Sequence, residues 1–477
     1  HGAILMVVGT LFFGSLAVFS KENGILLPLL IFLIEWLIFG FKASKNSTRY
    51  FVIGFIIVTV IIPGLLALSL LIIRFDWVLA GYNIRDFTIS ERLLTQARVI
   101  WFYINMILLP DPTQMGLYHD DIVLSKNWFE PSTTLPAILG ILTILIGVIA
   151  ARKRAPLLTF GILFFFAGHT LESTALSLEI AHEHRNYLPS YGLLLVSIYY
   201  LGHRKIRERL SPLVQTAFII LLILGLSTST AIRASYWSNN ADLALMEVQH
   251  HPLSARTSMQ AGYIFFLLAE HGVEPDLNRK RARQYFEKTR YLDHYNLTGS
   301  FSLLILDNTE EHPINTVLLD EIADRLKNQP LAAANINSLL KFSRCLHYEQ
   351  CKIPSDVFNQ LFKAILQNPT LRGKPRAQVL SEVAQFAISQ NDLGIALYLT
   401  YHALAINPDD PQIYLNLAHL LIHVEEFEAA HQAIEKARAL DHDAFLSTRI
   451  QAQEKLLEQA KARLTSNPES HEKNSTP

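Results

Sequence analysis

The sequence of 477 residues has little cysteine and no excess of charge of either sign. Cys345 and Cys351 are its only cysteines, and neither has the neighbouring ligands expected of a zinc site. The formal net charge is −1. Nucleic-acid binding usually needs a concentrated basic face, so we expect no nucleic-acid partner. The sequence also opens without Met or the basic region of a signal peptide, which favours a start inside a longer chain.

The composition changes near residue 232. Long apolar runs dominate before it, and polar residues at helical spacing follow it. We therefore expect an all-α fold, with a polytopic transmembrane helix bundle followed by a soluble α-solenoid of helix pairs. Each apolar run is close to the roughly 20 residues that cross about 30 Å of hydrocarbon. The seven predicted spans are 2–20, 23–41, 50–73, 135–151, 156–175, 187–202 and 212–232.

Short basic loops indicate the orientation, because Lys and Arg are retained on the cytoplasmic side. The basic loops are 42–49, 152–154 and 203–209, and they alternate correctly if the chain starts inside. Segments 74–134, 169–190 and everything after 232 are then exoplasmic. This scheme requires that 91–110 does not cross. Its polar and apolar residues suit an amphipathic interfacial or re-entrant helix.

Four polar groups that are far apart in the sequence meet on the exoplasmic side in this scheme. They are Lys21-Glu22, Tyr118–Asp121, the pair His169 and Glu172, and the run His182–Tyr187. Ionisable residues at membrane depth are costly and are therefore functional candidates. Clusters of His and carboxylates can hold a divalent metal, and Arg and Lys can hold phosphate oxygens. The combination fits a site for a lipid-linked phosphate.

The candidate residues fall into two sets. The predicted contacts to a donor phosphate are Lys21, Arg98, Arg185 and Tyr187. The predicted metal or polar cluster comprises Glu22, His119, Asp120, Asp121, His169, Glu172, His182, Glu183 and His184.

Each group also has a plainer interpretation. Lys21-Glu22 can be a snorkelling ion pair, and Tyr187 an interfacial anchor. His182 and His184 can be solvated loop residues, and His119–Asp121 an ordinary loop cap. His169 and Glu172, one turn apart on one helix face, can be a charged or metal-bridged pair, or a buried hydrogen-bonded pair that holds two helices together.

The soluble half contains a repeat. Residues 377–410 and 411–444 form two units of 34 residues, the period of tetratricopeptide repeats. The predicted packing positions are Leu380, Val383, Ala384, Ala387, Ala396, Ala403 and Pro408, then Tyr414, Leu417, Ala418, Leu421, Ala430, Ile434 and Ala437. Thr400 stands where a bulkier residue is usual. Such stacked helix pairs typically bind a peptide or protein, or serve only as a scaffold.

The rest of the soluble half is less regular. Residues 233–376 are predicted to form degenerate helical repeats, with one looser unit over 252–296 that has an insertion at 271–278. Residues 445–464 are predicted to form a capping helix. The tail 465–477 is predicted to be disordered, because it has no apolar residue able to pack.

Four stretches carry a resemblance to a known family. They are "SKENG" at 20–24, "ERLLTQARVIWFY" at 91–103, "EHRNYLPSYG" at 183–192 and "RASYWSNNADL" at 233–243. The chain resembles the polytopic glycosyltransferases of the GT-C class that are fused to tetratricopeptide repeats, like the transmembrane-and-repeat protein O-mannosyltransferases and their bacterial relatives. The family's catalytic acidic residue characteristically lies in the first exoplasmic loop, and we expect that loop to precede residue 1.

The resemblance implies transfer of a sugar from a polyprenyl-phosphate donor to a protein or glycan acceptor, aided by a divalent metal, Mg²⁺ or Mn²⁺. It also implies an integral protein of a bacterial inner membrane, in contact with membrane lipid, with periplasmic repeats that bind the acceptor or a partner. Two alternatives are a non-enzymatic membrane-anchored repeat scaffold and a polymerase or ligase of lipid-linked glycans. In an oxidising compartment Cys345 and Cys351 would be close enough in sequence to form a disulfide.

Overall fold

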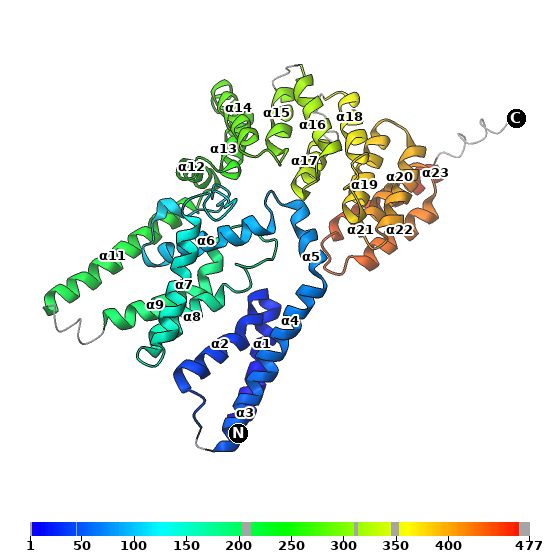
Figure 1. Ribbon diagram of the computed structural model, residues 1–477. Coiled ribbons are helices and arrows are strands. Elements are labelled where there is room, and N and C mark those ends of the chain that lie inside the picture. The colour runs from blue at the N-terminus through cyan, green and yellow to red at the C-terminus, as the bar shows by residue number, and fades with distance from the viewer. Residues whose placement is uncertain (1, 44, 203–210, 310–312, 345–352, 467–477) are drawn as a thin grey trace. The chain divides into compact units, whose positions relative to one another are not determined.

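The computed structural model describes residues 2–43, 45–202, 211–309, 313–344 and 353–466, and all regular elements in these ranges are helices (Figure 1). The chain divides into two compact units, His1–Tyr285 and Phe286–Pro477. Residues 233–285 therefore share a unit with the apolar helices, whereas we expected a boundary near 232. The basic loop 203–209, the two cysteines and the tail from 467 onward lie outside the described residues.

The first unit consists of helices joined by short turns and two longer irregular segments. Its α-helices are α1 (Gly2–Ser20), α2 (Leu27–Ile34), α3 (Asn46–Ile56), α4 (Ile62–Ile73), α5 (Phe75–Ala80), α6 (Ile89–Leu108), α7 (Thr134–Ala151), α8 (Pro156–Gly168), α9 (Tyr187–Leu201), α11 (Pro212–Tyr236), α12 (Asn240–His250), α13 (Ala255–Glu270) and the start of α14 (Pro275–Leu292). Single turns of 3₁₀ helix precede α2 and α9, and π-helical turns follow α2 and α3. The two irregular segments, 111–133 and 169–186, are called the 111–133 loop and the 169–186 segment below.

Four helical stretches in the described ranges are long and apolar enough to cross a membrane. They are Glu22–Phe39, Asn46–Ile73, Thr134–Ala151 and Pro212–Tyr236. None of the apolar window of Pro212–Tyr236 is buried inside the protein, and only 6% of that of Asn46–Ile73 is. Exposed apolar surface on this scale is unusual for a monomer in water and suggests association with a membrane.

The expected span 156–175 is shorter than predicted. Helix α8 ends at Gly168, so its 13 residues reach about 20 Å, less than the thickness of the hydrocarbon. The chain then enters the 169–186 segment, and His169 and Glu172 do not share a helix face as we expected. Beyond the helix end, carbonyl groups of residues 172–180 accept hydrogen bonds from side chains of α6.

Helices α8 and α9 lie side by side, as Figure 1 shows. A Cβ atom added at Gly161 would lie 2.4 Å from the carbonyl oxygen of Gly192, and one at Gly192 would lie 2.2 Å from that of Gly161. Two facing glycines therefore permit this close approach, as small residues do at helix interfaces in membranes. The contact brings the two ends of the 169–186 segment together.

Helix α6 corresponds to the predicted 91–110 helix, but its polar side faces inward. It begins with a capping box, in which Thr88 and Glu91 bond each other's backbone N–H groups. Arg92 and Gln96 are buried, whereas Leu93 is 47% exposed. The polar side chains of an interfacial helix are exposed to water. The expectation of an interfacial helix is therefore wrong for Arg92 and Gln96. These side chains are buried because the irregular segment beside them needs hydrogen-bond donors.

The looser predicted unit 252–296 is represented by α13 and α14. Ala261 and Ala282 are completely buried, and the rings of Phe265 and Tyr285 stack with centroids 5.6 Å apart. The connection spans only 271–274, shorter than the predicted insertion at 271–278. Pro275 begins α14, since proline is well suited to the first turn of a helix.

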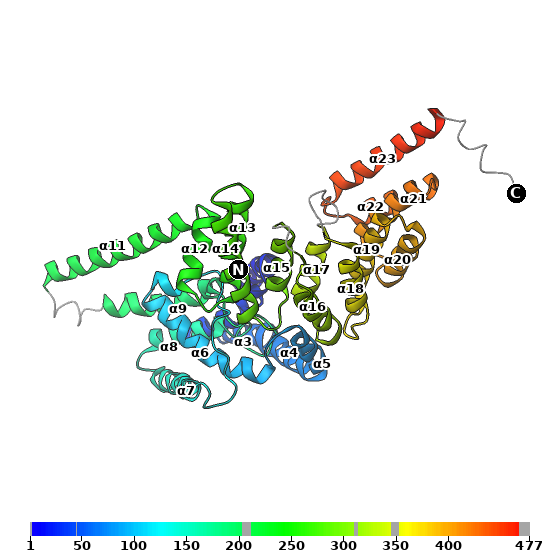
Figure 2. The ribbon, with the colours of Figure 1, turned by 90° about the horizontal axis from the view of Figure 1, so that it is seen from above.

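The second unit continues as a series of helices. Its elements are the end of α14, then α15 (Thr298–Thr309), α16 (Thr316–Asn328), α17 (Ala333–Ser343), α18 (Ser355–Leu366), α19 (Gly373–Ser389), α20 (Leu393–Ile406), α21 (Pro411–His423), α22 (Phe427–Leu440) and α23 (Ser447–Ser466). Helices α19–α22 form two antiparallel pairs that correspond to the predicted 34-residue units (Figure 2).

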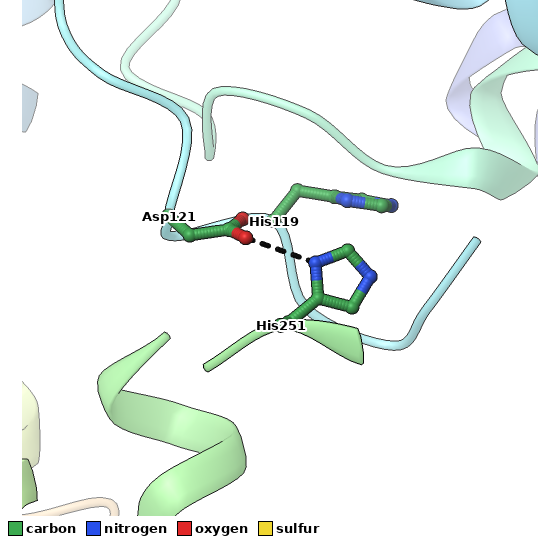
Figure 3. Close-up of side chains that lie close together, drawn as sticks. All are labelled: His119, Asp121 and His251. Carbon is green, nitrogen blue, oxygen red and sulfur yellow. Dashed lines mark hydrogen bonds and ion pairs between the residues drawn. The ribbon is translucent and has the colours of Figure 1, made fainter. Parts of the chain in front are cut away.

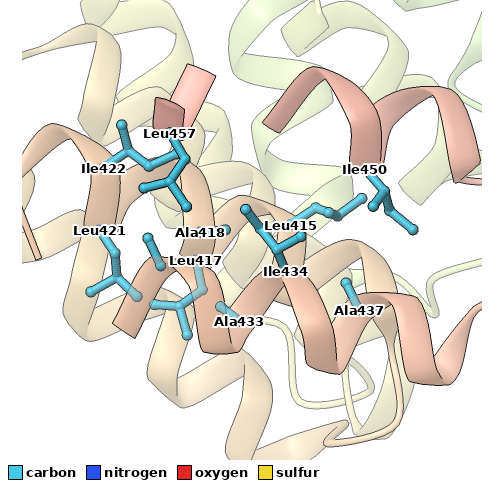
Figure 4. Close-up of a cluster of buried hydrophobic side chains, with 11 residues drawn as sticks. Leu415, Leu417, Ala418, Leu421, Ile422, Ala433, Ile434, Ala437, Ile450 and Leu457 are labelled. Atoms are coloured by element: carbon cyan, nitrogen blue, oxygen red, sulfur yellow. The ribbon is translucent and has the colours of Figure 1, made fainter. Parts of the chain in front are cut away.

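The predicted packing positions of these pairs are buried almost throughout. Ala384, Ala396, Ala403, Ala418, Ala430, Ile434 and Ala437 are completely enclosed, while Pro408 is exposed. Figure 4 shows the core between α21 and α22, which Ile450 and Leu457 of α23 complete. Helix α23 thus covers the end of the stack, at the place of the predicted capping helix.

Candidate functional site

Arg92 of α6 holds the 169–186 segment in place. Its guanidinium donates to the carbonyl oxygens of Glu172 at 2.6 Å, Thr174 at 3.0 Å and Glu179 at 3.1 Å, and also to that of Leu178. Gln96, one turn later, donates to the carbonyl of Ile180 at 2.7 Å. The side chains of α6 thereby replace the hydrogen bonds that a helix would have made for these carbonyls.

Glu172 and Arg185 form a buried ion pair inside this segment. Nε of Arg185 lies 3.1 Å from Oε2 of Glu172, and both side chains are less than a tenth exposed. Asn23 donates to the other carboxylate oxygen at 2.6 Å, and Arg185 also donates to the carbonyl of Glu179 at 2.7 Å. Asn23, 149 residues away in the sequence, thus meets the two ends of this segment here. Removing either charge would leave its partner buried and unpaired, which is strongly destabilising.

His169 lies near this pair, in contact with aromatic rings. Its ring stacks on Tyr103 with centroids 5.1 Å apart and meets Phe165 edge-on, while the Tyr103 hydroxyl accepts a hydrogen bond from the backbone of His182. The partners of the Glu172 carboxylate are Arg185 and Asn23. The expected direct pairing of His169 with Glu172 is therefore wrong, because the helix that would have placed them one turn apart ends at Gly168.

A second charged group lies at the start of α13. Arg256 donates two hydrogen bonds to the carboxylate of Glu179, at 2.9 and 3.0 Å, and Nε2 of His182 lies 2.8 Å from the same carboxylate. The hydrogen bond from His182, followed by that from Arg256, holds the pKa of Glu179 well below its ordinary value in spite of partial burial. This carboxylate stays ionised across the physiological pH range.

The 111–133 loop is attached to the same helix. Asp120 accepts a hydrogen bond from Ser254 at 2.5 Å and another from the backbone of Arg256 at 3.2 Å. Gln260 donates to the hydroxyl of Tyr118 at 2.7 Å, and the guanidinium of Arg256 lies over the Tyr118 ring. Asp120 therefore binds Ser254, the N-cap of α13, and supports the start of that helix.

His119 and Asp121 of this loop meet His251, which follows α12 (Figure 3). One possible ligand atom from each of the three side chains lies within 4.8 Å of the others. Nδ1 of His251 is 2.9 Å from Oδ2 of Asp121. This hydrogen bond raises the pKa of His251 against the effect of burial. Burial would raise the pKa of Asp121, but the same bond and the nearby histidine charges keep it below its ordinary value.

Glu183 and Glu247 lie beside these histidines. Nε2 of His119 is 3.5 Å from Glu183, whose carboxylate accepts from the backbone of Gly116 and pairs with Arg233 at 3.2 Å. Glu247 accepts from the backbone of Leu117 at 2.9 Å, and burial raises its pKa. A Cβ at Gly116 would lie 2.7 Å from Glu247 and 3.0 Å from Nε2 of His251. Only glycine leaves room here for the Glu247 carboxylate and the His251 ring.

Of the remaining predicted residues, His184 lies beside these groups, with its ring centroid 5.0 Å from that of His182. Arg98 donates to the carbonyl of Val123 at 2.5 Å, and Tyr187 is 89% exposed. Lys21, Glu22 and His184 are exposed. Partial burial and then the charge of Lys21 lower the pKa of His184, which indicates that these two side chains are neighbours.

Sequence reasoning missed several residues of the site, among them Asn23, Arg92, Glu179, Glu247, His251 and Arg256. All six lie outside the four polar groups that the topology scheme brought together. His250-His251 immediately before Pro252, at the start of the first repeat-like unit, is the signal that could have pointed to the missing histidine.

Comparison with known proteins finds a family match in the C-terminal part of the chain. Residues 387–453 match the model of the tetratricopeptide repeat family. A solved structure titled "Functional Characterization of Pseudomonas Aeruginosa pilF" aligns with 45% of this chain and 95% of its own, at 17% identity and a TM-score of 0.25. No curated protein matches the chain. The C-terminal part of the chain therefore contains tetratricopeptide repeats, over the helices that the 34-residue period predicted.

Proposed function

We propose that the chain is a membrane glycosyltransferase that moves a sugar from a polyprenyl-phosphate donor to a protein or glycan acceptor on the exoplasmic face. The observation that carries the proposal is the concentration of buried charge between α8 and α9. Glu172, Arg185 and the guanidinium of Arg92 are all enclosed directly beside apolar helices. Charge in this position is costly, and function is the usual reason for its presence.

In the proposed reaction, an acceptor oxygen forms a bond to the anomeric carbon while the bond from that carbon to the donor phosphate oxygen breaks. The acceptor proton passes to a general base that we do not assign to a residue. Arg185 would stabilise the negative charge that develops on the leaving phosphate, with Lys21 as a second cation at the surface. Glu172 and the carbonyl of Glu179 occupy Nε and Nη1 of Arg185 and so fix the plane of the guanidinium.

The family resemblance also implies a divalent metal. Two buried histidines beside carboxylates are a donor set that fits such an ion, and His119, Asp121 and Glu183 are the predicted residues around that position. A bound ion would supply positive charge for the donor phosphate. The repeats would bind the acceptor or a partner, as stacked helix pairs commonly do.

Replacement of Arg185 tests the site. Arg185→Lys keeps the charge and loses the planar fork of the guanidinium. We therefore expect transfer from a polyprenyl-phosphate sugar to be about a hundredfold lower in membranes that carry this variant of the whole protein than in membranes that carry the wild type. The matched control is Arg152→Lys, on the exposed loop after α7. Full transfer by Arg185→Lys at normal protein levels would contradict the assignment.

Glu172→Gln distinguishes a functional charge from a packing element. The change keeps the shape and hydrogen bonding of the side chain and removes its charge, which leaves Arg185 buried without its counter-ion. We expect normal membrane insertion and strongly reduced transfer. Normal insertion with full transfer at every metal concentration would show that the pair only holds the segment together.

The orientation is tested independently of activity. We expect a reporter fused after residue 240 to be active only in the exoplasmic compartment, and one fused near 206 only in the cytoplasm. The opposite pattern would place the charged groups on the side away from the lipid-linked donor.

The tetratricopeptide match favours one rival, a membrane-anchored scaffold without catalysis. A scaffold would tolerate neutralisation of Glu172 and Arg185 together, provided that the repeats stay folded. The third possibility is a polymerase or ligase of lipid-linked glycans. The product distinguishes it from a protein glycosyltransferase, because the product would be a lengthened glycan and not a glycosylated protein.

A further inference from the structure

The three side chains of Figure 3 come from parts of the chain that are far apart in sequence. His119 and Asp121 belong to the 111–133 loop, and His251 follows α12, 130 residues after Asp121. Contacts on both sides fix the position of His251. Its backbone N–H donates to the carbonyl of Glu247 at the end of α12, at 2.8 Å, and Ser254 caps the start of α13, so the turn that carries His251 is held at both ends.

Both histidines have a buried nitrogen without a hydrogen-bond partner. His119 is 5% exposed and His251 is 6% exposed, and Nε2 of each lacks a partner. The nearest carboxylate to Nε2 of His119 is that of Glu183, at 3.5 Å, which is too long for a hydrogen bond. Buried polar atoms are nearly always satisfied, so two free nitrogens in one cluster indicate a missing ligand.

Asp121 accounts for the other side of His251. Its carboxylate forms a hydrogen bond with Nδ1 of His251, and this leaves Nε2 as the ring nitrogen that is available to bind a metal ion. A carboxylate in this role orients metal-binding histidines and increases their basicity. The hydrogen bond between Asp121 and His251 gives Nδ1 of His251 a partner. It gives none to Nε2 of His119 or to Nε2 of His251.

We propose that His119 and His251, with Asp121 as the carboxylate that positions His251, bind one divalent transition-metal ion such as Zn²⁺ or Mn²⁺. Imidazole nitrogen favours these ions, whereas Mg²⁺ prefers oxygen ligands. Glu183 is the nearest additional carboxylate. The ion would clamp the 111–133 loop to the turn between α12 and α13. This inference does not rest on the proposed transferase activity.

Metal binding by the purified whole protein is the first test. The protein is prepared in detergent without a polyhistidine tag, stripped with a chelator, and titrated with Co²⁺ as a spectroscopic substitute for Zn²⁺. We expect about one ion per chain to remain after gel filtration, with a visible absorption band from nitrogen coordination. A roughly hundredfold excess of Mg²⁺ should not displace it. Failure to retain Co²⁺ or Zn²⁺, or displacement by Mg²⁺, would overturn the proposal.

Variants assign the ion to these residues. His251→Gln should abolish the absorption band, and Asp121→Asn should weaken binding about 10- to 100-fold. His431→Gln, on the exposed surface of α22, is the control and should bind like the wild type. Undiminished binding by either site variant would refute the assignment.

Two further measurements keep the test decisive. If His251→Gln does not fold, the titration of the wild type still tests the site, and His119→Gln replaces it as the variant. Sugar transfer is measured separately, so that metal binding without transfer contradicts only the proposed enzyme, and transfer without metal binding contradicts the clamp and the role of the ion in transfer but not the enzyme itself.

Discussion

The repeats α19–α23 and the 169–186 segment are both enclosed, but by different interactions. The repeats bury alanine, leucine and isoleucine against helices that are neighbours in the sequence. The 169–186 segment buries Glu172 and Arg185, and its partners come from distant positions. Asn23 is 149 residues from Glu172. Apolar packing depends on a local period that the sequence displays, whereas a buried polar group needs particular partners that no local pattern reveals.

The two regions should also respond differently to substitution. In an apolar core each lost methyl group has a cost that rises with the cavity it leaves. In a buried charged network the cost of one change depends on whether the partner remains. The four predictions that follow compare the regions on this point, from the largest effect to the smallest.

The largest effect is expected from separating the buried ion pair. Arg185→Met should lower the free energy of unfolding by about 3–5 kcal/mol, because Glu172 is left charged and enclosed. The double variant with Glu172→Met should recover most of this loss. Denaturation in detergent of the two single variants and the double variant gives the coupling energy. Additive losses would show that the two charges do not depend on each other.

In the repeats a single apolar truncation should be nearly as costly. Ile434 is completely buried between α21 and α22, so Ile434→Ala should lower stability by about 2–5 kcal/mol. Hydrogen exchange of the backbone amides in α21 and α22 of the whole protein measures this loss of stability. The control Ile395→Ala, at a half-exposed position of α20, should change stability by less than about 0.5 kcal/mol. Similar values for both isoleucines would mean that the repeat core is not closely packed.

The period made most of the repeat region predictable. Alanines 34 residues apart, such as Ala384 and Ala418, are both fully enclosed, because only small side chains fit where helices cross closely. Hydropathy likewise located most of the apolar helices. It failed at α8, where the predicted span ran on through the mainly polar residues 169–175 but the helix ends at Gly168. Hydropathy measures what a segment buries, and it does not report which donors compete for its carbonyls.

The site was predictable in part. Loop charge grouped His119 and Asp121 with Glu183, and the structure places these residues near one another. The loop charges gave no reason to add His251 or Arg256 to this group, because both belong to the helical region after residue 232. The choice between Arg185 and His169 as the partner of Glu172 was also beyond the sequence. It depends on where α8 ends and on which side chain then reaches the carboxylate.

A smaller effect is expected at Glu179, on the edge of the same segment. Because its pKa in the folded protein lies below the ordinary value of 4.5, its contribution to stability is present above that pH and is lost as the pH falls further. Arg256→Gln should therefore cost about 0.2–1 kcal/mol at pH 7, since both side chains are partly exposed. Thermal unfolding followed from pH 7 downward should show this difference persisting below pH 4.5 and shrinking only as the pH approaches the lowered pKa of Glu179 in the folded protein. A difference that has already vanished at pH 4.5 would have another cause.

The smallest effect is expected at Thr400, the one polar side chain at a repeat packing position. Its hydroxyl is buried but donates to the carbonyl of Ala396 in its own helix, at 2.8 Å. That carbonyl keeps its helical partner when the hydroxyl is removed, so Thr400→Val should change stability by less than about 0.5 kcal/mol.

Thr159 of α8 is the matched case in the other region. It is equally buried, but its hydroxyl donates to the carbonyl of Val148 in the neighbouring helix α7, also at 2.8 Å. Thr159→Val removes a bond between helices, and we expect a loss of about 0.6–1 kcal/mol in detergent unfolding. If Thr400→Val proves the more costly of the two, then polar groups in the repeats also depend on distant partners, and the distinction between the two regions does not hold for single hydroxyl groups.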